Sequence, residues 1–439
     1  MYTIFIFHRD YRSFDNLGLN YAMKHFDHII PIFIFTPEQI KKNKYLSNNS
    51  LQFLCESLEE LRDHIPLHIF YGDNLKVLSK INKTIPISNI VFNKDYTPYA
   101  IERDQSIDSW CVKKNINCVQ IEDYLLSPIS RFNKTDGSPY VVYTPFKNNV
   151  LKHSIPNTQN HPLKHLIYHK PLEHISYYSP NLDYYTYNPH NNVKGGRKNG
   201  LKYLHTNIDY EDQLSIKTTQ LSAYIKYGCL SIREVYHHFK DENLKAQLIW
   251  REFYYYINYY YPNLLKKSVA FQMKYDKIKW VNNKKHLEWW KRGETGFPVV
   301  DACMRQLNKT GYMHNRGRLI VSNFLNRLLG LDWRLGELYF AQQLIDYDPC
   351  VNNGNWQWVS SVGIDTKPYS QRVFNPWLQS KRFDPHCIYI KEWIPELNDV
   401  PPNEIHQWDL HGDPDIYILP IIDYTMARER SLQMYRTIQ

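Results

Sequence analysis

The sequence predicts two domains of different class, a Rossmann-like α/β domain with a five-stranded parallel sheet and an all-helical domain after it. The chain has 439 residues, which is too long for one average domain. Residues 1–130 alternate short β-branched or aromatic runs with amphipathic stretches, which is typical of a parallel sheet covered by helices. From residue 194 helical periodicity replaces this alternation until about residue 400.

Each strand of the first domain is expected where β-branched and aromatic residues cluster. The five runs are YTIFIF (2–7), IIPIFIF (29–35), LHIFY (67–71), NIVF (89–92) and CVQI (118–121). Helices are expected between them at 16–25, 50–63, 74–81 and 98–114. HRDYRSFDN, not a glycine-rich turn, follows the first strand, so an ordinary NAD site is not expected there.

A long connection separates the two domains. Residues 131–193 are rich in Pro, Asn, His and Tyr and have no sustained period, so we interpret them as an interdomain linker that lies over the surface. The helical domain then occupies 194–439.

Composition narrows the classes of function. The net charge of +9 permits a polyanionic partner without requiring one. No run approaches the roughly 18 apolar residues that span a bilayer. The seven cysteines are scattered and form no CxxC pair, so we expect neither a disulfide framework nor a metal site. We expect a soluble, intracellular monomer with reduced thiols.

Hydroxyl side chains cluster in TTQLSAYIKYGCLS (218–231). Thr218, Thr219 and Ser222 stand at the start of a helix that is expected to begin with Leu221. Hydroxyl groups, free amide N–H groups and the positive end of a helix can together bind a diphosphate. The same residues also make an ordinary helix cap, so this segment alone leaves both interpretations open.

Helical spacing places other polar and aromatic residues on common faces. Gln247, Trp250 and Arg251 fall at positions i, i+3 and i+4. Asn315 and Leu319 are likewise one turn apart. Two such faces can line one pocket.

Several long segments resemble the FAD-binding domain of photolyases and cryptochromes. They are LIWREFYYYI, GETGFPVVDACMRQLNKTGYMHNRGRLIVSNFL, LDWRLGELYFAQQLIDYDPCVNNGNWQWVSSVGID and FNPWLQSKRFDP, in the family order. The segment 218–231 resembles the family's phosphate-binding turn, and the first domain with YTPFKN (143–148) resembles its antenna domain more loosely. The resemblance covers nearly the whole chain and implies an all-α C-terminal FAD-binding domain.

The resemblance also assigns residues to the cofactor. The Arg318–Asp346 pair matches a salt bridge beside the flavin, and Asn352 matches the residue that faces flavin N5. Taken alone, Asn352 would be interpreted as a turn residue. Gln220 departs from the basic residue that is common at its position. The full set expected to bind FAD is Thr218, Thr219, Gln220, Leu221, Ser222, Arg318, Asp346, Asp348 and Asn352.

Three tryptophans match the family's electron relay. Trp356, Trp333 and Trp280 correspond to the chain that carries an electron from the surface to the photoexcited flavin. Indoles suit this role because they are oxidisable and large. Trp also packs cores, so some of the eleven tryptophans serve only that purpose.

On the substrate side, the resemblance implies a flipped-out DNA lesion that rests against Trp250 and Trp358. Gln247 stands where most bacterial-type dimer photolyases have a glutamate, and its amide can donate to a thymine carbonyl but cannot ionise. The expected catalytic residues are Gln247, Trp250, Asn315 and Trp358, and the expected DNA-binding residues are Arg251, Arg316, Leu319 and Arg372.

The implied function is light-driven repair, in which an electron passes from photoexcited reduced FAD to a cyclobutane pyrimidine dimer in DNA. A (6-4) photolyase is an alternative, but Asn315 and Leu319 stand where those enzymes place proton-donating histidines. A signalling cryptochrome without repair is another, although such proteins often have long disordered tails and this chain ends about 40 residues after Pro401. An antenna chromophore, folate or deazaflavin, also occurs in the family. Ala100 stands where folate-binding members have a carboxylate, and the sequence does not identify the pigment.

Overall fold

The computed structural model describes residues 2–206, 208, 211–364 and 367–438. The chain divides into two compact units. The first consists of Met1–Asn188, Val193–Asn207 and Thr219–Pro262, and the second consists of Pro189–Asn192, Ile208–Thr218 and Asn263–Gln439. The first unit therefore includes helices from beyond residue 194, where the sequence suggested that the helical domain begins.

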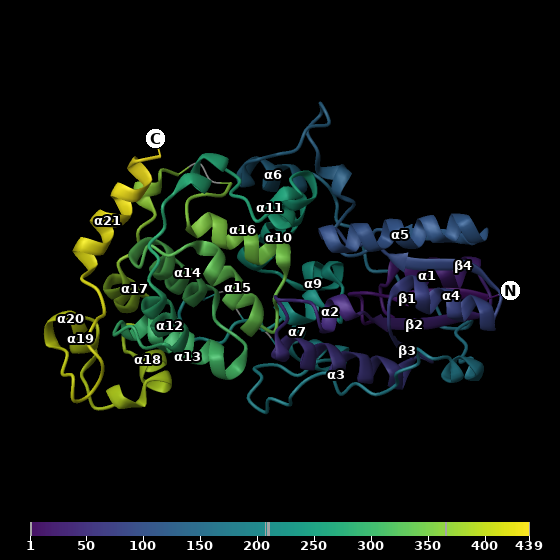
Figure 1. The fold of residues 1–439 in the computed structure, drawn as a ribbon, viewed down its shortest axis with the longest axis horizontal. Coiled ribbons are helices and arrows are strands. Elements are labelled where there is room, and N and C mark those ends of the chain that lie inside the picture. Colours follow the sequence, from purple (N-terminus) through teal and green to yellow (C-terminus); the bar gives the residue numbers. More distant parts are fainter. Residues whose placement is uncertain (1, 207, 209–210, 365–366, 439) are drawn as a thin grey trace. The chain divides into compact units, whose positions relative to one another are not determined.

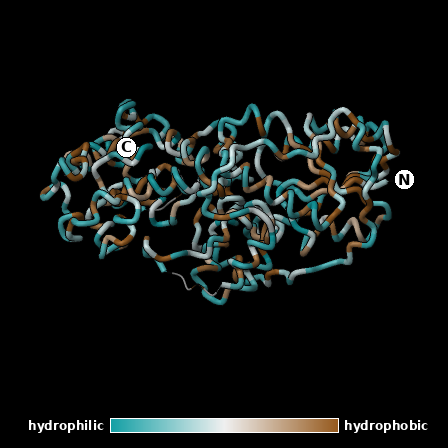
Figure 2. Tube along the Cα trace, turned by 90° about the horizontal axis from the view of Figure 1, so that it is seen from below, coloured by the Kyte–Doolittle hydropathy of each residue, from teal (hydrophilic) through white to brown (hydrophobic). Residues whose placement is uncertain are grey.

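A five-stranded parallel sheet forms the centre of the first unit (Figure 1), with the strand order β3-β2-β1-β4-β5. The strands are β1 (Tyr2–Phe7), β2 (Ile29–Phe35), β3 (His68–Tyr71), β4 (Ile87–Asn93) and β5 (Asn117–Ile121). Residues of β1 and β2 are almost all buried, as expected of strands covered on both faces. Figure 2 shows hydrophobic stretches of the chain near the N-terminus, where this sheet lies. The predicted sheet is confirmed, with small differences at the strand ends.

Helices surround this sheet, and each begins at a capping side chain. They are α1 (Leu17–His25), the short α2 (Pro37–Ile40), α3 (Asn48–His64), α4 (Asn74–Thr84) and α5 (Pro98–Lys114). Thr97 caps α5, whose first residue is a proline, and Asn115 ends it in the left-handed conformation. Apolar residues of α4 and α5, such as Val77 and Ile107, pack with the strands in one buried cluster.

The segment that we expected to be a linker lies largely on the first unit. It is mostly irregular, with 3₁₀ turns at Ile129–Phe132 and Lys170–His174 and one helix, α6 (Tyr143–Val150). Leu166 forms a β-bridge with Ile29, and Tyr178 forms one with Phe70. These bridges attach the segment to the first residue of β2 and to the edge strand β3.

A buried ionic cluster attaches the later helices to the sheet in the first unit. These helices are α7 (Arg197–Leu204), α8 (Ser222–Lys226), α9 (Ile232–His238) and α10 (Glu242–Tyr260). From α9, the Nη2 atom of Arg233 lies 2.7 Å from Asp123 and 3.0 Å from Asp15. Arg12 forms a second ion pair with Asp123, at 2.6 Å. Buried charges are tolerated only when they are paired in this way, so the cluster fixes α9 to the loops after β1 and β5.

The second unit contains helices and no strand in the part that the structure describes. Its helices are α11 (Asn263–Lys266), α12 (Lys284–Arg292), α13 (Pro298–Thr310), α14 (Asn315–Asn323), α15 (Trp333–Gln343), α16 (Pro349–Val359), α17 (Pro376–Phe383), α18 (Ile388–Trp393), α19 (Pro402–Ile405), α20 (Trp408–His411) and α21 (Tyr424–Arg436). A π-helical turn, Phe324–Leu328, continues α14. No described helix has the length and apolar character that crossing a bilayer requires.

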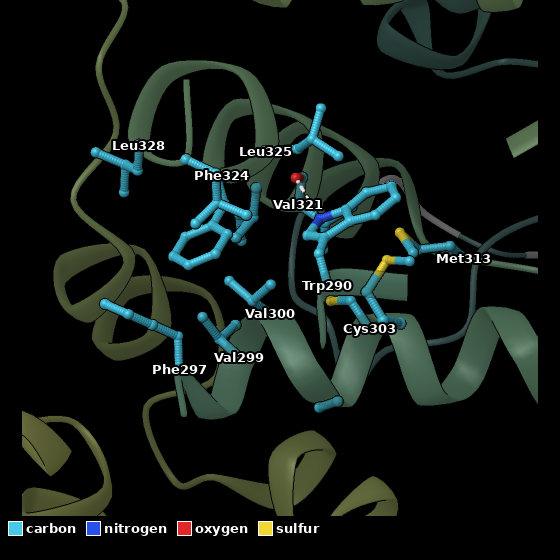
Figure 3. Close-up of a cluster of buried hydrophobic side chains, with 14 of the residues drawn as sticks. Trp290, Phe297, Val299, Val300, Cys303, Met313, Val321, Phe324, Leu325 and Leu328 are labelled. Atoms are coloured by element: carbon cyan, nitrogen blue, oxygen red, sulfur yellow. Dashed lines mark hydrogen bonds between the residues drawn. The ribbon is translucent and has the colours of Figure 1, made fainter. Parts of the chain in front are cut away.

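The core of this unit is built around aromatic side chains (Figure 3). Trp290 is fully buried, and its indole N–H donates to the carbonyl of Val321 at 3.0 Å. Phe297 and Phe324 pack together with ring centroids 4.8 Å apart. A buried indole needs such an acceptor, so this bond fixes α12 against α14.

Candidate cofactor and substrate site

An ion pair between Arg318 and Asp346 lies where the sequence predicted it. Arg318 extends from α14, and its Nη2 lies 2.9 Å from Asp346 Oδ2. Its Nε donates to the carbonyl of Met313 at 2.9 Å, which fixes the guanidinium plane. The Asp346 side chain is 7% exposed, and its Oδ1 has no partner among the described residues. A buried carboxylate oxygen without a donor is costly, so Oδ1 is a ready acceptor for a bound ligand.

His314 supplies a second buried polar atom in the same part of this unit. Its Nδ1 accepts a hydrogen bond of 3.0 Å from the backbone N–H of Arg316 and so caps α14. The ring proton of the neutral imidazole is therefore on Nε2, which is buried. Burial lowers the pKa of His314 to about 4. At neutral pH the residue is thus a neutral hydrogen-bond donor.

Asp348 and Asn352 are ordered by helix α16. Asp348 is the N-cap residue of α16, and its Oδ1 accepts from the backbone N–H of Cys350 at 3.0 Å. Asn352 lies within the helix rather than in a turn, and its Nδ2 donates to the carbonyl of Glu337 on α15 at 3.0 Å. The amide of Asn352 is therefore held in one orientation, only 9% exposed.

The predicted phosphate-binding turn precedes α8. This helix starts at Ser222, one residue later than expected, and no side chain caps its Leu221 end. Gln220 adopts the left-handed conformation with φ of 57°, which forms the turn. Thr218 and Tyr312 both belong to the second unit, and their hydroxyl groups lie 2.7 Å apart. Thr219 is half-buried and Ser222 is exposed. The alternative of a Ser/Thr helix cap is therefore not what the structure has.

The three predicted relay tryptophans share one hydrophobic cluster of the second unit. Trp356 and Trp333 are 2% and 1% exposed, whereas Trp280 is only partly buried and packs against that cluster. The series therefore runs from buried to accessible indoles. The Arg334 guanidinium lies 4.6 Å from the centre of the Trp333 ring.

Two residues that the sequence analysis missed determine where Trp356 lies. Trp290 contacts it edge to face, with ring centroids 6.3 Å apart and planes at 74°. Gly336 on α15 approaches so closely that a Cβ there would lie 2.1 Å from Cη2 of the Trp356 indole. A glycine inside a helical pattern is a weak signal of close packing, and nothing in the sequence gives its partner.

The first unit holds three of the residues predicted to contact substrate, all on α10. Gln247 is exposed, and Trp250 is half-buried and stacked on Tyr143. The Arg251 side chain is 11% exposed, and its Nη1 lies 3.0 Å from the buried carboxylate of Glu252. Its guanidinium also lies 4.3 Å from the centre of the Tyr124 ring. Arg251 is therefore held by its own unit.

The second unit holds the others. Asn315 is exposed at the first position of α14, and Leu319 is half-buried one turn later. The Nε of Arg316 donates to Asp212 at 3.1 Å. Arg372 is 6% exposed, and its guanidinium carbon lies 3.5 Å from the centre of the Trp358 ring. A cation this close to an indole face is a strong cation–π contact, so Arg372 fixes the orientation of Trp358.

Two family models and a relative of known class match this chain. A family model described as the FAD binding domain of DNA photolyase matches residues 244–437, and one described as DNA photolyase matches residues 3–164. A deoxyribodipyrimidine photo-lyase of Alkalihalophilus pseudofirmus is 32% identical over 479 residues, which cover 98% of this chain and 97% of that protein.

Solved structures give the same result. An archaeal photolyase from Sulfolobus tokodaii, described with two FAD molecules, is 38% identical with a TM-score of 0.89, and all of each chain is covered. A Synechocystis cryptochrome is 25% identical with a TM-score of 0.89 over 99% of each chain. The chain therefore belongs to the DNA photolyase family and contains that family's FAD-binding domain.

Proposed function

We propose that this protein is a light-driven repair enzyme that binds FAD and splits cyclobutane pyrimidine dimers in DNA. The buried carboxylate of Asp346, whose Oδ1 has no donor within the described residues, carries the proposal. A flavin and its ribose offer both donors and acceptors. The second unit supplies an acceptor on Asp346, a donor on His314 and a fixed amide on Asn352. These residues fit the cofactor that the family model implies.

We assign the other cofactor contacts by family position. Thr218, Thr219 and Ser222 supply hydroxyl donors to a diphosphate, and Asp348 contacts the ribose side. Gln220 and Leu221 form the turn itself. The second flavin in the Sulfolobus tokodaii protein favours a further, light-harvesting chromophore in this chain as well.

When bound and reduced, FAD supplies on illumination the electron that opens the cyclobutane ring. The residues of the chain bind and orient the lesion. Trp250 and Trp358 offer aromatic surfaces to the unstacked bases, as enzymes that flip bases require. Gln247 is exposed on the same helix as Trp250 and donates an amide N–H to a base carbonyl. It cannot transfer a proton, and ring opening by electron donation and return does not need one.

The arginines have a supporting role in this proposal. Arg251, Arg316 and Arg372 are each held by a carboxylate or an aromatic ring of their own unit. Their positive charge still attracts DNA phosphates, while their orientation is set before DNA binds. We further propose that Trp356, Trp333 and Trp280 relay electrons that return FAD to its reduced form.

The lesion class follows from two positions on α14. Repair of the (6-4) product needs a proton donor in the pocket, and Asn315 and Leu319 are not acids. His314 is adjacent, but its imidazole is buried, caps α14 and has a pKa of about 4. It is therefore neutral at the pH of the cell and is not a general acid there.

Two oligonucleotides of the same sequence test this assignment, one with a single cyclobutane dimer and one with a single (6-4) product. We expect the reduced protein under blue light to restore the thymines of the first and to leave the second unchanged. Repair of the (6-4) product alone would refute the lesion assignment. Repair of neither by protein that contains FAD would favour a light-signalling role.

A further inference from the structure

Trp250 has a partner on the first unit that family position does not explain. The ring of Tyr143, the first residue of α6, stacks on the indole with centroids 3.5 Å apart and planes within 8°. This is a full face-to-face contact at van der Waals distance. One face of the indole is therefore covered by protein.

Tyr143 is itself fixed to α10 at two points. Its hydroxyl donates to the carbonyl of Ala246 at 3.1 Å, one turn before Trp250. Its ring also meets that of Phe253 edge to face, with centroids 5.7 Å apart. Because both contacts are to the helix that carries Trp250, the ring and the indole keep the same relative position.

The rest of α6 strengthens this attachment. Phe146, one turn after Tyr143, is fully buried and packs against Phe253 at 5.2 Å and Tyr256 at 4.9 Å between ring centroids. The helix thus cannot slide along α10 without breaking an aromatic cluster. Packing of α6 against α10 therefore fixes Tyr143 beside the half-buried indole of Trp250.

Such a stack has a consequence for ligand binding. Trp250 is half-buried, and a flat ring can stack only on the part of the indole that Tyr143, Phe253 and Tyr254 leave exposed. Rotation of the indole about its side-chain bonds would break this stack, so the stack favours one orientation of Trp250. A surface that is already oriented loses little conformational freedom on binding, so the affinity for a stacked ligand increases.

We propose that Tyr143 is a positioning residue for damaged DNA, which acts by holding the indole of Trp250 in a single orientation with one face covered. The inference rests on the proposed function and deepens it, because it assigns Tyr143 to the recognition of the extruded bases. It predicts an effect on binding of the lesion and not on the chemical step that follows.

The test compares Tyr143→Leu with Tyr143→Phe. Leucine removes the stack, whereas phenylalanine keeps it and loses only the bond to Ala246. We expect Y143L to bind an oligonucleotide with one cyclobutane dimer up to about tenfold more weakly in the dark, since a side chain that must become ordered on binding costs roughly that factor. We expect Y143F to bind as the wild type does. Tyr140→Leu, three residues earlier and beside Lys134, is the matched control and leaves affinity unchanged.

Two further measurements distinguish a positioning role of Tyr143 from a general loss of protein structure in the variant. Affinity for the undamaged oligonucleotide and the rate of repair at saturating damaged DNA should change less than about twofold in Y143L. In a Trp250→Leu background, Y143L should cause no further loss of affinity, because the effects of two substitutions are not additive when one residue acts through the other. If circular dichroism shows that Y143L is not folded, Tyr143→Met replaces it.

The outcomes distinguish this inference from the proposed function. A wild-type protein that binds damaged and undamaged DNA equally would contradict the proposed function. If the wild type discriminates and folded Y143L binds the lesion equally well or more tightly, Tyr143 does not position Trp250 and the inference is wrong. An equal loss in Y143F would also overturn it, because the stack would then not be the cause.

Discussion

Gly336→Ala should destabilise the second unit and move Trp356. The added Cβ would lie 2.1 Å from Cη2, 2.6 Å from Cζ3 and 2.8 Å from Cζ2 of the indole. Either the indole or α15 must shift by about 1 Å or more to restore van der Waals contact. Such overpacking costs about 1–3 kcal/mol. Alanine gains at most about 1 kcal/mol over glycine inside a helix, so the clash should prevail.

Thermal unfolding measures the effect. We expect a net loss of about 1–2 kcal/mol, which lowers Tm by a few degrees in a unit of this size. The smaller ring in Trp356→Phe relieves the clash, so G336A in that background should cost less than it does in the wild type. A Tm for G336A that is unchanged or raised would refute the reasoning, because helix propensity would then outweigh packing. We also expect slower photoreduction of FAD in G336A, measured by absorbance under blue light.

Trp356→Phe should abolish or strongly slow photoreduction of oxidised FAD and leave repair by pre-reduced protein nearly intact; unchanged photoreduction would make Trp356 a packing residue only. Asp346→Asn should lower the FAD retained per chain after gel filtration, because Arg318 loses its charged partner, while Asp332→Asn at the α15 cap should retain it. His314→Asn keeps a side chain that can cap α14 and removes the titratable imidazole. The folded-state pKa of His314, about 4, is below the ordinary 6.5, so the unfolded chain binds a proton first as the pH falls. Between pH 7 and pH 4 the free energy of unfolding of the wild type should therefore decrease by about 3 kcal/mol more than that of H314N, measured by urea unfolding. If the free energy of unfolding changed with pH equally in both proteins, His314 would not be buried as a neutral ring.

The sheet could be predicted because its strands are continuous apolar runs. β1 and β2 begin and end at the predicted residues, since a buried parallel strand leaves a local pattern. Helix α6 was missed because YTPFKNNV has a proline near its start and only two buried side chains, Phe146 and Val150. The first unit also extends to Pro262 because Arg233 pairs with Asp15 and Asp123, more than 100 residues earlier in the chain. No local period encodes such a pairing.

The candidate site likewise contains residues that the sequence predicted and residues that only the structure reveals. Arg318, Asp346 and Asn352 lie within recognisable motifs, so resemblance could assign them. Tyr143 and Gly336 matter through contacts with Trp250 and Trp356 that only the folded chain reveals. The exposure of the three arginines was also not predictable, because a guanidinium looks the same in sequence whether it faces solvent or a buried carboxylate.

Removal and return of FAD tests the central claim most directly. The loss of cyclobutane dimers from a defined oligonucleotide is measured under blue light with FAD-loaded reduced protein, with protein stripped of FAD, and with stripped protein to which FAD has been restored and reduced. We predict dimer loss with the first and third samples in the light, and none in the dark or without FAD. Dimer loss that persists in the dark or without FAD, or its absence from the FAD-loaded reduced protein in the light, would contradict the account.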